Sequence, residues 1–225
     1  MSLSPELVAQ RIRAIQQTIP DNVTLIAVTK QVPVELMAIA YDMGIRNFGE
    51  SKVQEAAEKQ AQLDRPGITW HLIGHLQRNK AAKALQQFQW IHSLDSIKLA
   101  KRLDQLAEAA GDEPRVCLQV KLRHDPSKYG WSPEELLPAL PQLNQCKNLR
   151  IEGLMAIPPY GLSEEETRAI FEETRSLADK ISQLPLDRLK ITQLSIGMSN
   201  DYLLAIASGA TMVRLGRVIF GERQY

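Results

Sequence analysis

The sequence has little cysteine, no long hydrophobic run and almost no net charge. Cys117 and Cys146 are its two cysteines, and their spacing fits neither a disulfide framework nor a zinc site. Nowhere is an apolar run long enough to span a bilayer, and the first residues mix charged with apolar side chains, so we expect a soluble cytoplasmic protein. With 27 basic and 26 acidic residues, the chain offers no electrostatic field for nucleic acid or for an anionic membrane. A small-molecule ligand is therefore favoured.

Nucleotide-binding loops and domain linkers are also missing. No Gly-x-Gly-x-x-Gly pattern follows the first apolar run and no Walker-type loop is present, which argues against an open doubly wound sheet, the main alternative fold. No Pro/Gly/Ser-rich linker or charge run divides the chain. We therefore interpret residues 1–225 as one domain.

Short apolar runs alternate with amphipathic segments along the chain. Buried strands are predicted at residues 23–29, 45–48, 69–73, 90–93, 116–120, 151–157, 191–196 and 211–215. Helices are predicted at residues 5–19, 33–44, 52–63, 79–88, 97–110, 133–143, 164–184 and 201–207, two of them opening with capping boxes, Ser132 with Glu135 and Ser163 with Glu166. Eight strand–helix units predict an α/β fold, a single (β/α)8 TIM barrel, in which the N-terminal helix takes the place of a missing final one.

Residues that could contribute a reactive side chain or a backbone N–H group to a site recur where the predicted strands end. They are Lys30, Asn47 to Glu50, Gly74, His75, Ser93, Asp95, Lys121, Met155, Ser195, Gly197, Arg214 and Gly216. Barrel enzymes build their sites at the carboxyl ends of the strands, and the loops after the seventh and eighth strands often hold phosphate. The sequence thus predicts a site on this face.

The two last strand ends predict a phosphate cup. Residues 194–201 form a strand end that opens into a helix, so that backbone N–H groups near Gly197, Ser199 and Gly216 can converge on an anion. Ordinary turn glycines and an N-cap serine would explain the same residues equally well.

Lys30 and Arg214 complete the pattern. Lys30 directly follows an apolar strand, where desolvation favours a neutral amine able to form a Schiff base. The alternative is that Lys30 forms an ion pair with Glu50 or Asp95 at the rim of the barrel. Arg214 lies one pleat from Gly216 and points to the same side, although a salt bridge across the barrel top would also explain it. A Schiff-base lysine, a phosphate cup and an inward arginine together suggest pyridoxal 5′-phosphate (PLP).

Several blocks resemble one known family, that of the PLP-binding pyridoxal phosphate homeostasis (YggS/PROSC) proteins. These blocks cover nearly the whole chain and are residues 27–30 (Ala-Val-Thr-Lys), 48–50 with 54–55, 70–80 (Trp-His-Leu-Ile-Gly-His-Leu-Gln-Arg-Asn-Lys), 92–96, 153–155, 194–201 and 212–221. The resemblance implies an alanine-racemase-like barrel (PLP fold type III) without the C-terminal β-domain of the racemases.

The resemblance also implies roles for individual residues. Lys30 would form the internal aldimine, Arg214 would face the pyridine nitrogen, and Asn47 and Met155 would lie near the ring. Ser199, Gly216 and neighbouring N–H groups would hold the phosphate, with Ser195 and Gly197 in the same cup. The chain departs from the family pattern at three places: Ser51, where the family usually has Asn, Arg217, where it usually has Thr or Ser, and residues 121–125. Arg217 is still a candidate for phosphate binding, through its charge or its backbone N–H.

The function implied is intracellular homeostasis and supply of PLP by a monomer that passes the cofactor to apo PLP-dependent enzymes. Efficient catalysis is not expected, because the related racemases carry a further β-domain and a tyrosine base, whereas this chain stops at Tyr225. A PLP-dependent racemase or decarboxylase is the alternative, and a Schiff-base aldolase a third. A metal site is not expected, since His71 and His75 straddle a strand end without a carboxylate to complete a ligand set.

Overall fold

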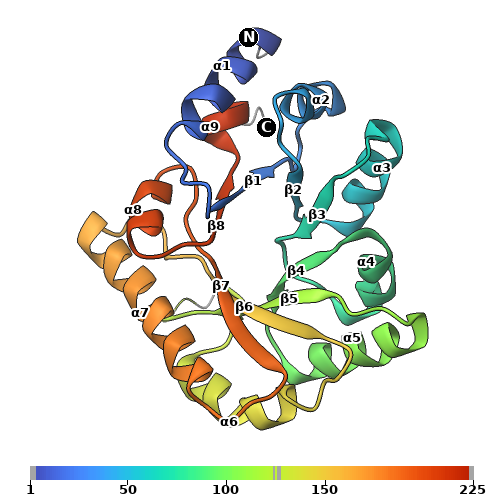
Figure 1. The fold of residues 1–225 in the computed structure, drawn as a ribbon, viewed down its shortest axis with the longest axis vertical. Helices are drawn as coiled ribbons and strands as arrows, with labels where there is room; N and C mark the ends of the chain where they lie inside the picture. Colours follow the sequence, from blue (N-terminus) through green and yellow to red (C-terminus); the bar gives the residue numbers. More distant parts are fainter. Residues whose placement is uncertain (1–3, 124, 126–127, 223–225) are drawn as a thin grey trace.

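The computed structural model describes residues 4–123, 125 and 128–222. Within them, parallel strands pair in sequence order and the last pairs with the first, which closes a barrel (Figure 1). The strands are β1 (Thr24–Val28), β2 (Asn47–Glu50), β3 (Thr69–Leu72), β4 (Trp90–Leu94), β5 (Arg115–Val120), β6 (Arg150–Ala156), β7 (Leu189–Ser195) and β8 (Met212–Leu215). The predicted (β/α)8 barrel is confirmed, and the doubly wound alternative was wrong because β1 and β8 are hydrogen-bonded to each other.

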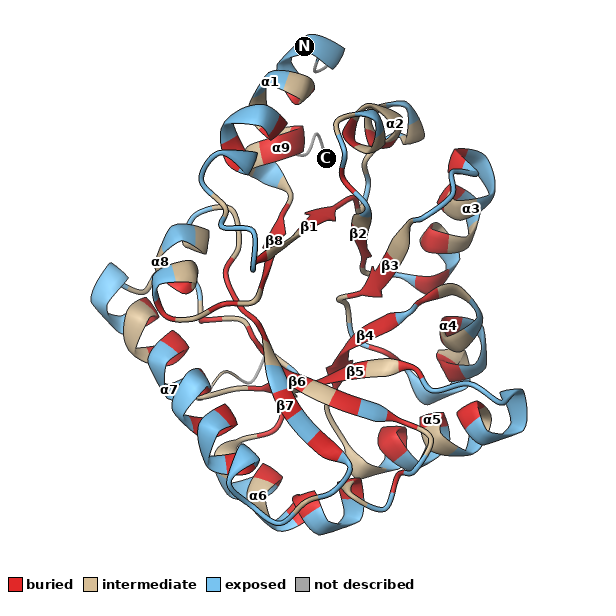
Figure 2. Ribbon diagram, in the orientation of Figure 1, coloured by how far each residue is buried: buried red, intermediate tan, exposed pale blue. Residues whose placement is uncertain are grey.

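Helices surround the barrel, with their buried residues turned toward the strands (Figure 2). They are α1 (Pro5–Gln16), α2 (Val34–Asp42), α3 (Val53–Leu63), the 3-10 turn η1 (Arg78–Lys80), α4 (Ala81–Gln87), α5 (Ile97–Ala110), α6 (Pro133–Leu143), α7 (Glu164–Ser182), α8 (Tyr202–Ala207) and α9 (Arg217–Phe220). Both predicted capping boxes form. None of the helices in the described residues is long and apolar enough to cross a membrane.

The N-terminal helix packs on the outside of the barrel next to its last element. Val8, Ile12 and Ile15 recur at helical spacing and form the buried face of α1. α1 lies against α2 and α9 (Figure 1). The sequence predicted that the final helix is missing. The structure instead has a short final helix, the single turn α9, and α1 packs against it.

Strand β2 differs from its prediction in a way that moves a candidate residue. The apolar Ile45 is buried without belonging to the strand, because it closes the end of α2 through a hydrogen bond from its N–H to the carbonyl of Ala40 at 3.0 Å. Gly44 makes this turn possible with a φ of +91°. Asn47 is consequently the first residue of β2 and not, as predicted, a residue at its carboxyl end.

Candidate functional site

The carboxyl ends of the strands open into a large cavity. Its volume is about 1050 Å³, and it is lined by residues at or after the ends of β1, β2, β3, β5, β6, β7 and β8. Five of the predicted site residues line it: Lys30, Ser199, Arg214, Gly216 and Arg217. The structure thus brings together the predicted Schiff-base lysine, the inward arginine and part of the predicted phosphate cup.

The cavity has a positive lining. Among the described residues, its lining includes five basic residues, Lys30, Lys128, Arg168, Arg214 and Arg217, and two acidic ones, Glu164 and Asp201. Such a surface attracts an anion and disfavours a cationic ligand.

Arg214 is the most constrained of these basic groups. Its side chain is buried, and its guanidinium donates hydrogen bonds to the Ser195 carbonyl, to Ser195 Oγ at 2.7 Å and to the Ala156 carbonyl at 3.0 Å. Burial lowers the pKa of Arg214 to about 10, although the nearby Asp201 carboxylate opposes the shift. No ion pair within the described ranges involves Arg214, so these residues show no salt bridge from this guanidinium across the barrel top. A buried cation whose hydrogen-bond partners among the described residues are a hydroxyl and backbone carbonyls favours an anionic or hydrogen-bond-accepting ligand.

The loops after β7 and β8 meet at one side chain. Ser199 Oγ accepts hydrogen bonds from the N–H groups of Gly216 and Val218, both at 3.3 Å. These two N–H groups therefore converge on a single oxygen position, as an anion-binding turn requires. Ser199 is not the N-cap of a helix, since α8 begins at Tyr202 with Asp201 at its N-cap.

Gly197 shapes the first of these loops. Its φ is +89°, and a Cβ added there would lie 2.5 Å from Cβ of Ala205. Gly197 is buried and does not line the cavity. Its place in the predicted cup is thus that of a backbone turn that lets α8 pack close to the loop.

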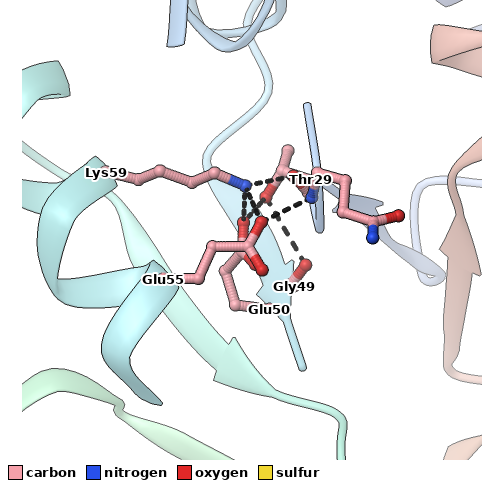
Figure 3. Close-up of polar contacts among 6 residues, drawn as sticks. Thr29, Gly49, Glu50, Glu55 and Lys59 are labelled. Carbon is pink, nitrogen blue, oxygen red and sulfur yellow. Dashed lines mark hydrogen bonds and ion pairs between the residues drawn. The ribbon is translucent and has the colours of Figure 1, made fainter. Parts of the chain in front are cut away.

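A buried charge cluster holds the segment that carries Lys30 (Figure 3). Lys59 of α3 donates hydrogen bonds to the Thr29 carbonyl at 2.5 Å, to Glu50 Oε1 at 2.9 Å and to Glu55 Oε1 at 2.6 Å. The Thr29 hydroxyl also donates to Glu50 Oε1, at 2.7 Å, and the N–H of Gln31 donates to Glu55 Oε1, at 2.5 Å. Both neighbours of Lys30 are therefore tied to the same cluster.

The cluster is strongly desolvated. Glu50 has no exposed surface, and burial raises the pKa of its carboxyl group against the hydrogen bonds from Lys59 and Thr29. Burial also acts to raise the pKa of Glu55, but hydrogen bonds from Lys59 and Gln31 lower it overall. Lys59 forms an ion pair with Glu50, and His75 lies 3.0 Å from Asp95. Both carboxylates that were considered as rim partners of Lys30 therefore have another partner, an ammonium group for Glu50 and an imidazole for Asp95.

The other predicted site residues lie inside the barrel, beneath the cavity. Met155 is fully buried in an apolar layer with Ile26, Trp90, Cys117 and Met212. Ser195 is buried against Arg214, and Asn47 contacts His71 through a hydrogen bond of 3.0 Å. These three residues do not line the cavity, although Ser195 contacts Arg214, which does.

The sequence analysis gave no binding or positioning role to four side chains of this region: His71, His92, Lys59 and Glu55. His71 and His92 are buried in the barrel and hydrogen-bonded to each other, whereas His75 lies exposed at the rim. Polar residues inside apolar strands were a signal for the two histidines, and the i,i+4 spacing of Glu55 and Lys59 was a signal for the cluster. Of the unusual segment 121–125, Arg123 pairs with Glu173 at 2.6 Å, and His124 lies outside the described residues.

Comparison with known proteins identifies the family. The model of the alanine racemase N-terminal domain matches residues 4–224. A pyridoxal phosphate homeostasis protein of Synechocystis sp. is 47% identical over 207 residues, which cover 92% of this chain and 94% of the relative.

Solved structures agree with this assignment. The structure of PipY from Synechococcus elongatus with PLP bound superposes with a TM-score of 0.91 and 47% identity, covering 95% of this chain and 100% of PipY. An alanine racemase of Clostridium difficile has a TM-score of 0.82 at 15% identity, covering 98% of this chain and 58% of the racemase, which shows a shared barrel fold. The chain therefore belongs to the family of the pyridoxal phosphate homeostasis proteins, built on the barrel of the alanine racemase N-terminal domain.

Proposed function

We propose that this protein binds PLP in the cavity at the carboxyl ends of the strands and takes part in intracellular PLP homeostasis and supply. The observation that carries the proposal is the composition of the cavity. A lysine at the end of β1, a buried guanidinium and two convergent N–H groups lie around one space. The bound PLP of the related PipY supports the same ligand here.

The residues present fit the cofactor. When bound, PLP supplies an aldehyde carbon and an electron-withdrawing ring. Lys30 would hold the aldehyde carbon covalently, Arg214 would donate to the ring nitrogen, and Ser199 with the N–H groups of Gly216 and Val218 would hold the phosphate. Arg217 is exposed at the cavity edge and would add its charge.

The remaining predicted residues would act from behind this layer. Ser195 would hold Arg214, Gly197 would shape the phosphate loop, and Met155 would fill the barrel below. Asn47, at the amino end of β2, would be linked to Arg214 through His71, His92 and Ser195.

Ser199→Ala is expected to weaken PLP binding. The lost hydroxyl would remove one hydrogen bond to a charged phosphate, worth about 1.5–3 kcal/mol, or roughly tenfold to a hundredfold in Kd. Spectroscopic titration of the cofactor-free protein measures the change. Ser208→Ala is the matched control, because Ser208 does not line the cavity and its hydroxyl donates to the Leu204 carbonyl at the end of α8.

The direction of the effect is informative. In this structure the Ser199 hydroxyl occupies the same two N–H groups that would reach a phosphate. Tighter PLP binding by Ser199→Ala would mean that the hydroxyl competes with the phosphate. Equal affinities of the unmodified protein for pyridoxal and for PLP would contradict the phosphate site itself.

We further propose that the protein, acting as a single-domain monomer, carries PLP without efficient turnover. Its relatives are named as homeostasis proteins and not as enzymes. The chemistry of Arg214 agrees, because a guanidinium is a donor that stays charged and does not protonate a ring nitrogen, which leaves the ring a poorer electron sink.

Cofactor transfer tests this carrier function. PLP-loaded protein mixed with an apo PLP-dependent enzyme is expected to restore that enzyme's activity. Incubation with a panel of L- and D-amino acids is expected to give no sustained racemisation, decarboxylation or transamination. Turnover at ordinary enzymatic rates, roughly 1–10³ s⁻¹, would instead favour the racemase or decarboxylase.

A further inference from the structure

A continuous chain of hydrogen bonds crosses the barrel interior below the cavity. Arg214 of β8 donates to Ser195 Oγ of β7 at 2.7 Å, and this oxygen lies 2.8 Å from Nδ1 of His92 on β4. His92 Nε2 lies 2.9 Å from Nδ1 of His71 on β3, and His71 Nε2 lies 3.0 Å from Oδ1 of Asn47 on β2. Five strands, remote in sequence, thus contribute one side chain each.

Burial removes water as an alternative hydrogen-bond partner for most side chains of this hydrogen-bond chain. The exposed fractions are 3% for Arg214, 0% for Ser195 and His92, and 1% for His71. A buried polar hydrogen without an acceptor costs about 1–3 kcal/mol, so each proton of the chain must face an acceptor.

The arginine fixes the direction of the chain. Because a guanidinium only donates, Ser195 Oγ accepts from Arg214, and its own proton must find an acceptor. Nδ1 of His92 is the acceptor within reach. His92 then carries its proton on Nε2 and donates to Nδ1 of His71, which in turn donates through Nε2–H to Asn47.

The reverse direction fails at Ser195. If Asn47 donated to His71, then His71 would donate to His92, and His92 Nδ1–H would point at Ser195 Oγ. Arg214 points at the same oxygen, so the hydroxyl proton would have no acceptor among the described residues around it. The direction from Arg214 to Asn47 leaves none of these protons without an acceptor.

We propose that His92 and His71 are positioning residues that hold Arg214 against the cavity through this one-directional hydrogen-bond chain. The proposal rests on the proposed function, because Arg214 is the group that would face the ring of the cofactor. Ser195 links the histidines to Arg214, and Asn47 anchors the far end at the start of β2.

Packing and charge support neutral, fixed rings. Trp90 stacks on His71 with an interplanar angle of 10°, and its ring centroid is 5.6 Å from that of His92. Burial and then the Arg115 charge lower the pKa of His71 to about 3, while burial, His71 and Arg214 lower the pKa of His92 well below its ordinary value. A neutral imidazole has one donor and one acceptor nitrogen, as each position of the chain requires.

Nitrogen-15 NMR of the cofactor-free protein tests the direction of the chain. The sequence has four histidines, so their ring signals can be assigned by single substitutions. We expect His71 and His92 in the Nε2–H form at about pH 5 to 8, with scalar coupling across the hydrogen bond that joins them. A ring that carries its proton on Nδ1, or is an imidazolium, would overturn the assignment.

Binding experiments test the positioning role. Ser195→Ala and His92→Leu each break the chain, and each is expected to weaken PLP binding about tenfold, the size expected for one hydrogen bond to a charged group, and to shift the absorption of bound PLP. Ser93→Ala is the matched control, because Ser93 is equally buried on β4 but its hydroxyl has no partner within the described chain. Ser93→Ala should leave both measurements unchanged.

The outcomes separate the two proposals. Failure of the unmodified protein to bind PLP would reject the proposed function, whereas the NMR result would still decide the direction of the chain. Normal PLP affinity and spectrum in His92→Leu would reject the positioning role while leaving PLP binding intact. If one variant fails to fold, the other still tests the positioning role, and the tautomers of the unmodified protein still test the direction of the hydrogen-bond chain.

Discussion

Lys30→Ala is expected to abolish covalent retention of PLP. Lys30 lines the cavity beside Arg214 and Ser199, whereas the segment around it is held by Thr29, Gln31 and their partners and not by the Lys30 side chain alone. The variant should therefore keep its fold and lose the absorption band of lysine-bound PLP. Borohydride reduction followed by peptide mapping measures the effect, and label should be found on Lys30 in the unmodified protein and on no residue in the variant.

Lys128→Ala is the matched control for this experiment. Lys128 lines the same cavity, and its ammonium group donates to the carbonyls of Ile157, at 3.2 Å, and Pro158, at 2.5 Å. Burial lowers the pKa of Lys128, which favours its neutral amine and makes it a competitor for the aldehyde. Label on Lys128 in the unmodified protein would show that the assignment of Lys30 is wrong.

Lys59→Met is expected to cause the largest loss of stability. It would leave Glu50, which has no exposed surface, without its cationic partner and would remove the donor to Thr29 and Glu55. Removing one partner of a buried ion pair typically costs about 3–5 kcal/mol in the free energy of unfolding. Urea denaturation measures this cost.

Two further variants isolate the cause of that loss. The double variant Lys59→Met/Glu50→Gln should be more stable than Lys59→Met alone, because the Glu50→Gln change removes the uncompensated buried charge. Lys83→Met, at an exposed position on α4, should change stability by less than about 0.5 kcal/mol. Equal losses in the single and double variants would show that charge is not the cause.

The loss should also depend on pH. The folded state raises the pKa of Glu50 above its ordinary 4.5, so the unfolded chain releases this proton first and stability falls as pH rises above 4.5. Without Lys59 the pKa rises further, which enlarges the effect. The defect of Lys59→Met should therefore shrink as the pH is lowered toward 4.5.

Local features were predictable from the sequence because their causes lie within a few residues. Ser132 and Ser163 cap α6 and α7 as their Ser-x-x-Glu patterns predict. Apolar runs separated by amphipathic segments predicted the strands and thus the barrel. The barrel in turn explains why Lys30 and Arg214, far apart in the chain, line the same cavity.

Other features depended on partners that the sequence does not place. Asn47 lies at the amino end of β2 because Ile45 is hydrogen-bonded to Ala40 at the end of α2, so that the strand starts two residues later. Met155 packs in an apolar layer with Ile26 and Trp90, which come from other strands. Residues next to a strand end can point into the cavity or into the barrel, and only the register of the neighbouring strands decides which.

The sequence by itself determined the family, the barrel and the candidates Lys30, Ser199 and Arg214, because periodicity, capping and motif spacing are local properties of the chain. Only the tertiary structure decided which groups hold those candidates in place. Lys59 reaches Thr29 from another element, and His71 and His92 connect Asn47 to Ser195 across the barrel interior. Such contacts form because buried polar groups need partners, and which partners they obtain depends on how the closed barrel brings remote strands together.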